Sequence, residues 1–320
     1  MKASFFLPTD GLQGDEDRCS LSALAQIGRL AEQIGFDGCA ISEHPAPGVS
    51  SMAYGGHCQL DPFVALTAVA AATTRLRLQT HLLVLPYRNP LLTANAAASL
   101  DALSGGRLTL GVGAGYSEAE FRALGVDFHE RNELTDEAIT VLKTAWAGEP
   151  LRFKGRHFEA TENLMWPLPH QRPHPPLWVG GNSNRAIRRA VELGDGWIPF
   201  PNPPELAAQR HSRALYSIAE LRERISYVRR YTREVRRTQP LEIVFLPLTA
   251  QPWMPEAPSA QSIVDGAGAC VEAGVTYFTL AIVGPAKDPT LGAFLSNMEW
   301  FGAHVLPHIE GMRPRVAATA

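Results

Sequence analysis

The chain has 320 residues, of which 45% are hydrophobic and 19% are charged. This composition excludes a largely disordered chain, because enough apolar surface is available to build a core. Basic and acidic residues nearly balance, at 29 and 32, so the charge gives no basis for binding nucleic acid or an anionic membrane. The apolar runs are shorter than the ~20 residues of a membrane span, and the N-terminal stretch turns acidic too early for a signal peptide. We therefore expect a soluble cytoplasmic protein.

Cysteine and histidine spacing argues against a metal site. The four cysteines contain no CxxC pair, which indicates reduced thiols rather than disulfides or a zinc site. His170 and His174 have i, i+4 spacing, but the surrounding prolines exclude the helix that would bring both rings to one face.

Short β-rich apolar runs alternate with helical patterns from end to end. In chain order the expected strands are 3–8, 38–42, 75–84, 107–113, 177–180, 196–200, 241–248 and 276–283. The expected helices are 22–34, 62–73, 91–103, 118–124, 133–146, 185–193, stretches within 204–237, 259–273 and 291–307. Alternation of this kind predicts a (β/α)8 TIM barrel formed by residues 1–320 as a single domain, with a doubly wound sheet as the rival fold.

Three connections are long: 45–61, 149–176 and 249–258. The first and third follow strands, so in a barrel they lie at the C-terminal face and are expected to be lids or binding loops. The second precedes a strand and is rich in proline, which favours an extended insertion over a second domain.

The helix at 62–73 is apolar nearly all round, and the helix at 91–103 is rich in alanine. An outer barrel helix needs a polar face unless something covers it. We therefore expect a homodimer through these two helices; the alternative is that an insertion of the same chain covers them.

Glu43 and His44 follow the second expected strand, where barrel enzymes carry their catalytic groups. A carboxylate and an imidazole at that place can hydrogen-bond a ring edge or move a proton near neutral pH. The alternative interpretation is a helix cap or a surface pair.

Two glycine-containing turns follow the strands at 107–113 and 177–180. The first, at 111–118, differs from the dinucleotide fingerprint because Tyr116 replaces the last glycine, and Ser117 is expected to cap a helix with Glu120 at the N3 position. The second, at 180–185, exposes backbone N–H groups at a helix start and predicts a phosphate site, with positive charge added by Arg185, Arg188 and Arg189. Ordinary capped turns are the alternative for both.

The third expected strand is long, which predicts a bulge near 81–84. Arg88 and Asn89, just beyond it, are expected either to bind substrate or to cap the next helix. The strand ends supply no facing carboxylate pair and no histidine cluster, and the chain has neither a GxSxG elbow nor a P-loop. A phosphate-bearing redox cofactor therefore suits this set of residues better than hydrolysis does.

These residues lie in stretches that resemble the bacterial-luciferase-like superfamily of flavin-dependent oxidoreductases, and within it the coenzyme-F420-dependent branch. The stretches cover roughly residues 40–200: SEHP, DPFVALTAVAAATTRLRL, LVLPYRNPLLTA, SLDALSGGRLTLGVGAGYSEAEFRALGVDFHER and RPHPPLWVGGNSNRAIRRAVELGDGWIPF. The resemblance implies a barrel whose mouth holds a flavin or deazaflavin ring. It places Glu43 and His44 near the reactive centre of that ring.

The resemblance also implies the cofactor contacts. His81 and Leu82 correspond to a bulge behind the ring, often with a non-prolyl cis peptide. The remaining contacts fall in the two turns, at Ala114, Gly115 and Tyr116 for the cofactor side chain and at Gly180, Gly181, Asn182 and Ser183 for its phosphate.

The cofactor itself is left open by one departure from the family. Many F420-dependent members carry Asp-His at the second strand and FMN-dependent members commonly carry Glu-His-His, whereas this chain has Glu-His-Pro. The arginine-rich stretch 205–237 is expected either to form a basic rim that binds the acidic tail of F420 or to form a solvated helix pair.

We favour an F420-dependent hydride-transfer enzyme acting on a small organic molecule. The alternatives are an FMN-dependent monooxygenase served by a separate flavin reductase, and a flavin-binding barrel without catalysis. Tyr54, Trp197 and Trp253 are the aromatic candidates for an apolar substrate pocket.

Overall fold

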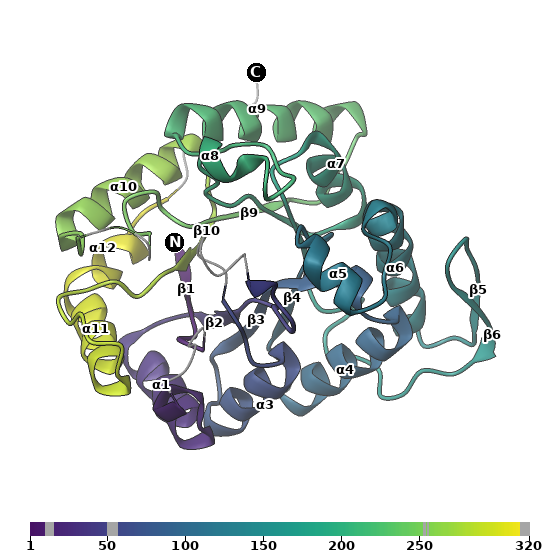
Figure 1. The fold of residues 1–320 in the computed structure, drawn as a ribbon, viewed down its shortest axis with the longest axis horizontal. Helices are drawn as coiled ribbons and strands as arrows, with labels where there is room; N and C mark the ends of the chain where they lie inside the picture. Colours follow the sequence, from purple (N-terminus) through teal and green to yellow (C-terminus); the bar gives the residue numbers. More distant parts are fainter. Residues whose placement is uncertain (10–15, 50–56, 252–253, 255, 314–320) are drawn as a thin grey trace.

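The computed structural model describes residues 1–9, 16–49, 57–251, 254 and 256–313. Its parallel strands close into a barrel in the order β1-β10-β9-β8-β7-β4-β3-β2, and the helices surround them (Figure 1). This arrangement confirms the predicted (β/α)8 barrel. The barrel strands are β1 (Lys2–Phe6), β2 (Gly38–Ile41), β3 (Arg77–Val84), β4 (Leu108–Gly113), β7 (Leu177–Gly180), β8 (Gly196–Ile198), β9 (Glu242–Phe245) and β10 (Tyr277–Leu280).

The helices follow the predicted order along the chain. They are α1 (Leu21–Ile34), α3 (Pro62–Ala72), α4 (Pro90–Leu103), α5 (Glu118–Ala123), α6 (Arg131–Trp146), α7 (Asn184–Leu193), α8 (Pro204–Ala207), α9 (Ile218–Glu234), α10 (Ala260–Ala273), α11 (Leu291–His304) and α12 (Leu306–Glu310). Three 3-10 turns accompany them: η1 (Glu16–Cys19), η2 (Leu85–Tyr87) and η3 (Phe128–Glu130).

Local chemistry explains where several helices begin and end. The Ser20 hydroxyl accepts a hydrogen bond from the Ala23 N–H at the start of α1. The same helix ends at Gly35, whose φ of 97° lies in the left-handed region that a side chain disfavours. Asp61 caps α3, and Pro62 takes the first helical position, where its missing N–H costs nothing.

The stretch 204–237 contains the expected helical stretches, α8 and α9. Leu215, between them, forms a β-bridge with Asn202, which precedes α8. One expected helix differs. The expected helix 291–307 is two helices, because Pro307 has no N–H to continue the hydrogen-bond ladder of α11.

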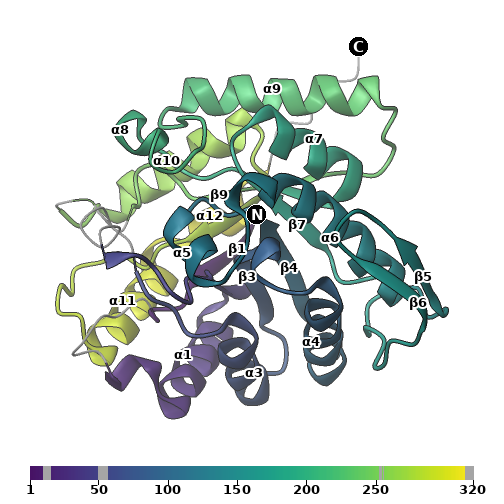
Figure 2. The same cartoon turned by 45° about the vertical axis from the view of Figure 1, so that its right-hand side comes forward.

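The insertion at 149–176 contains an antiparallel hairpin that the sequence did not predict. Its strands are β5 (Leu151–Lys154) and β6 (Glu159–Asn163), and it projects from the side of the barrel beside α6 (Figures 1 and 2). The Glu137 carboxylate accepts hydrogen bonds from the N–H groups of His157 and Phe158, which ties the hairpin to α6.

The barrel interior combines apolar packing with a small polar layer. Trp178, Ile198, Val244 and Tyr277 form a buried apolar cluster there. Beside them the Ser4 hydroxyl lies 3.0 Å from the Gln79 side-chain oxygen and 3.3 Å from the Thr279 hydroxyl. These buried polar groups satisfy one another, so the strands close without an unpaired hydroxyl at this level.

Candidate active site

The predicted site residues come together because their strands are neighbours. In the barrel order, β2, β3, β4 and β7 are adjacent, and parallel strands present their carboxyl ends on one face. The segments after these four neighbouring strands therefore share one half of the barrel mouth.

His44 is held by a carboxylate from a distant part of the chain. Its Nδ1 atom lies 3.0 Å from Oε2 of Glu120, a fully buried residue of α5, and its Nε2 atom lies 3.4 Å from the Tyr116 hydroxyl. The His57 ring packs edge-on against it at 4.7 Å between centroids. A carboxylate at Nδ1 favours the tautomer with the proton on Nδ1, which leaves Nε2 as the atom that can accept a proton.

Glu120 is the residue of the candidate site that the sequence interpretation did not place there. It was expected only as the third residue of a capped helix, and Ser117 does cap α5 by accepting the Glu120 N–H at 3.4 Å. Its carboxylate also accepts a hydrogen bond from the Ala46 N–H and one from the Tyr87 hydroxyl at 3.4 Å. Burial opposes its ionisation, but the hydrogen bond and charge of His44 outweigh burial, and the pKa of Glu120 lies below its ordinary value. Glu120 is thus a carboxylate at neutral pH.

Glu43 points to β3 instead of to His44. The buried Glu43 carboxylate accepts hydrogen bonds from the Val84 N–H at 2.6 Å and from the Arg88 guanidinium at 2.8 and 2.5 Å. Arg88 also pairs with Asp61 at 2.6 Å. Burial raises the pKa of Glu43, and the Arg88 charge and the Val84 N–H act in the opposite direction. The structure therefore gives Glu43 and Arg88 a bracing contact, and their expected roles toward ring and substrate stay predictions.

Asn89 takes the capping alternative. Its side-chain oxygen accepts the Leu91 N–H at 2.9 Å at the start of α4. If this oxygen bound a substrate instead, the hydrogen bond that caps α4 would be lost.

The bulge predicted in β3 is present. The pairing of β3 with β4 shifts register between Thr80 and Leu83, and the His81–Leu82 peptide bond is cis, as the resemblance implied. Burial lowers the pKa of His81 to about 3, so its ring is neutral where it packs against Phe6.

Leu82 explains a glycine that was assigned to the cofactor. A Cβ atom on Gly180 would come within 2.0 Å of the Leu82 Cδ1 atom, and one on Gly113 within 3.0 Å. Leu82 therefore lies where a side chain on residue 180 would extend, and a larger residue there would have to displace it.

The turn after β4 is closely packed. Gly115 has a φ of +76°, and a Cβ there would meet Val84 at 2.6 Å and Phe121 at 2.8 Å. With no side chain at that position, Ala114 and Tyr116 lie half-buried on either side of it at the mouth.

The turn after β7 is held by hydrogen bonds to neighbouring segments. Gly181, with a φ of +120°, donates its N–H to Ile198 and accepts the Trp197 indole N–H at 2.8 Å. Asn182 is buried and bonds the Phe200 backbone through both side-chain atoms. Ser183 is exposed and caps α7 by accepting the Ala186 N–H. The Gly181 N–H is thus occupied, whereas a helix start such as that of α7 leaves its first N–H groups without intrahelical partners.

This geometry changes the meaning of Trp197. The residue is fully buried beneath the turn. Its indole N–H supports the turn through the hydrogen bond to Gly181, and its full burial gives no evidence for a role in a substrate pocket. Tyr54 and Trp253, the other aromatic candidates, lie outside the described residues.

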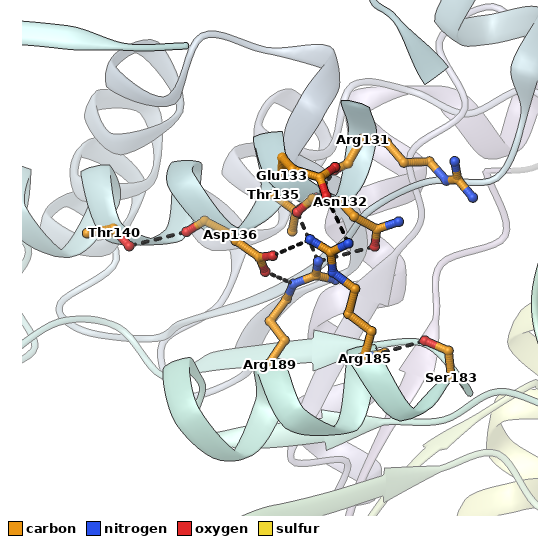
Figure 3. A network of polar contacts seen from close by, with 10 residues as sticks. Arg131, Asn132, Glu133, Thr135, Asp136, Thr140, Ser183, Arg185 and Arg189 are labelled. Atoms are coloured by element: carbon orange, nitrogen blue, oxygen red, sulfur yellow. Dashed lines mark hydrogen bonds and ion pairs between the residues drawn. The ribbon is translucent and has the colours of Figure 1, made fainter. Parts of the chain in front are cut away.

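The prediction that three arginines of α7 charge this turn is wrong. Figure 3 shows Arg185 and Arg189 reaching across to α6, where Asp136 binds both guanidinium groups. Arg185 also pairs with Glu133 at 3.0 Å. Arg188 donates to the Tyr227 hydroxyl of α9 at 3.0 Å. All three side chains bind other helices.

Within the described residues, no group of three or more His, Cys, Asp or Glu side chains is arranged to hold a metal ion. The described helices also include none with the length and apolar character needed to cross a bilayer.

The chain is thus a parallel (β/α)8 barrel with an imidazole held by a buried carboxylate at its mouth. The family model of luciferase-like monooxygenases matches residues 1–236, and the chain belongs to that family. It is therefore an enzyme of the oxidoreductase class.

The chain is also similar to individual known proteins. An uncharacterised protein of Mycobacterium tuberculosis is 31% identical over 255 residues, covering 78% of each chain. A coenzyme F420-dependent tetrahydromethanopterin reductase from Methanopyrus kandleri has a TM-score of 0.72 at 16% identity, covering 96% of this chain and 99% of that one. The FMN complex of the oxygenating constituent of 3,6-diketocamphane monooxygenase from Pseudomonas putida has a TM-score of 0.75 at 15% identity, covering 98% and 99%. At these identities the solved structures show a common fold.

Proposed function

We propose that this protein is an F420-dependent oxidoreductase that transfers a hydride between the deazaflavin C5 and a small organic substrate. The observation that carries the proposal is the His44–Glu120 pair at the barrel mouth, next to Tyr116 and one strand away from the turn that starts α7. The family membership and the F420-dependent reductase of the same fold support it.

The residues at the mouth fit such a cofactor. The half-exposed Leu82 offers an apolar surface for a planar ring, and the first N–H groups of α7 suit a phosphate. The bound deazaflavin would supply the carbon that gives or takes the hydride. Ala114, Gly115 and Tyr116 would lie along its side chain, and Ser183 at its phosphate.

The chain's own contribution is to hold and move a proton at His44. Glu120 keeps the proton on Nδ1, so Nε2 accepts a proton from the substrate side or returns one to it. The buried negative charge of Glu120 also stabilises the imidazolium that forms when Nε2 is protonated. Tyr116, in contact with Nε2, is placed to pass that proton onward.

The second candidate is an FMN-dependent monooxygenase working with a flavin reductase. The diketocamphane monooxygenase structure with FMN favours it, as does a turn that suits a single phosphate. Titration of the purified protein with F420 and with FMN, followed by turnover assays, decides between them. Tight FMN binding without F420 binding would refute the F420 proposal, and turnover of any substrate excludes a barrel that only binds the cofactor.

We also propose that the protein is a homodimer through α3 and α4. Val64 of α3 is 68% exposed and Leu92 of α4 is 73% exposed, although this chain's own insertion runs close by. Asn95 of α4 donates to the Trp166 carbonyl, and the Trp166 side chain is 82% exposed beside it. An apolar face of this extent is unusual on a monomer. Sedimentation should show a dimer that Val64→Glu with Leu92→Glu converts to monomer; a wild-type monomer at micromolar concentration would refute it.

A further inference from the structure

Arg224 is a buried arginine without an acidic partner. It lies on α9, which packs on α7 (Figure 1), and it is only 3% exposed. Its neighbour Glu223 pairs with Arg213 instead, at 3.0 Å. Within the described residues no carboxylate forms an ion pair with Arg224, and its buried Nε atom has no hydrogen-bond partner.

The guanidinium is directed to the start of α7. Its Nη2 atom donates to the side-chain oxygen of Asn184 at 2.7 Å, and Asn184 is the first residue of that helix. Asn184 and the capping residue Ser183 are both exposed. The positive end of α7 and a buried cation therefore meet at one accessible place.

An unpaired buried charge is costly unless a partner compensates it. Burial, together with the nearby Arg213 charge, lowers the pKa of Arg224, so the site disfavours the cation as it stands. An anion at the helix start would compensate the charge of the guanidinium while it accepts from the first N–H groups of α7.

We infer that Arg224 and the N-terminus of α7 form a phosphate subsite, with Arg224 supplying the charge that the α7 arginines do not. The inference rests on the proposed function for the identity of the bound molecule, which is the phosphate-bearing end of a flavin or deazaflavin cofactor. It assigns the charge recognition of that cofactor to α9, outside the glycine turn.

The test compares matched ligands with and without phosphate. Arg224→Met should weaken FMN, or F420, at least tenfold, and should leave riboflavin, or the phosphate-free deazaflavin, within twofold of wild type. Arg222→Gln is the control, because it removes an exposed arginine of the same helix that pairs with Glu272. Equal losses for both members of a ligand pair, or no loss, would overturn the inference.

A melting experiment with inorganic phosphate tests the subsite independently of the cofactor. If neither flavin nor deazaflavin binds, that result refutes the proposed function but not the subsite. Phosphate should raise the Tm of wild type and of Arg222→Gln but not that of Arg224→Met. In phosphate-free buffer Arg224→Met should be at least as stable as wild type, because it removes an uncompensated charge. No rise in wild type, or an equal rise in Arg224→Met, contradicts the subsite.

A second variant covers the case in which Arg224→Met does not fold. Asn184→Ala removes the side-chain amide whose oxygen accepts from the guanidinium. It should weaken FMN at least threefold and leave riboflavin unchanged; an equal effect on both ligands contradicts the subsite.

Discussion

Arg88→Gln tests whether Arg88 braces the barrel or serves the substrate. In the structure its guanidinium binds the buried Glu43 carboxylate at 2.8 and 2.5 Å and reaches Asp61 at 2.6 Å. The substitution would leave Glu43 with the Val84 N–H but without a cation. Breaking a buried ion pair costs roughly 3–5 kcal/mol, and the 28% exposure of the Arg88 side chain reduces this to about 2–4 kcal/mol. With an unfolding entropy of about 2.1 cal/mol/K per residue over the 320 residues, we expect Tm to fall by about 3–6 °C.

The loss should depend on pH in a definite direction. Burial already raises the pKa of Glu43, and removing the Arg88 charge raises it further. The folded variant then binds a proton more tightly than the unfolded chain does, so its stability increases as the pH falls through that raised pKa. The deficit of Arg88→Gln should therefore be larger at pH 8 than at pH 5.

Thermal unfolding at both pH values, in a double-mutant cycle with Glu43→Gln, measures the pair directly. We expect a coupling of about 2 kcal/mol at pH 8. Arg152→Gln is the control, since Arg152 and Glu162 form an exposed pair worth less than about 1 kcal/mol. If the two losses simply add, the bracing role is refuted. If Arg88→Gln keeps full stability and raises KM instead, the bracing role is refuted and Arg88 contacts substrate.

Three further substitutions test the site and its scaffold. His44→Asn should lower kcat by about 10²–10⁴-fold with an unchanged cofactor Kd, since Asn keeps a polar side chain but cannot exchange a proton; full activity would remove His44 from the mechanism. Gly181→Asp should weaken the cofactor at least tenfold, or ~1.4 kcal/mol, by placing a carboxylate beside the anion site, whereas Gly125→Asp, at a left-handed turn in open space, should not. Asp136→Asn should destabilise the fold by about 2–4 kcal/mol in urea unfolding, because it leaves the buried Arg189 without a carboxylate, and a change below about 0.5 kcal/mol would contradict this.

The predictions that succeeded depend on short stretches of chain. The pattern of strands is sufficient to predict the barrel. Ser117 and Ser183 mark the starts of α5 and α7, because a capping hydroxyl bonds an N–H within the next three residues. The bulge at His81 was visible as a strand too long for a barrel, and the resemblance supplied the cis peptide.

The predictions that failed depend on which distant side chain lies opposite. His44 follows β2 and Glu120 follows β4, with β3 between these strands in the barrel. No local sequence pattern indicates that the two side chains are partners. In the same way, Arg185 and Arg189 follow the turn in sequence, but their side chains extend to α6 because Asp136 lies there. The hairpin at 151–163 was hidden because its strands are only four and five residues long, and β6 has a single apolar residue, Ala160.

The bonds of Asn182 bear on how this barrel can be recombined with its relatives. Its amide binds the Phe200 backbone and the Arg213 carbonyl, and Asn202, two residues beyond Phe200, pairs with Leu215. The turn after β7 and the segment after β8 are therefore one hydrogen-bonded unit, although α7 and β8 separate them in the chain. A chimera that exchanges either segment alone would leave the buried Asn182 amide without its hydrogen-bond partners. A chimera that exchanges residues 180–217 together keeps these hydrogen bonds. Loop grafting in this barrel should respect that boundary, and so should any natural recombination that has reshaped its mouth.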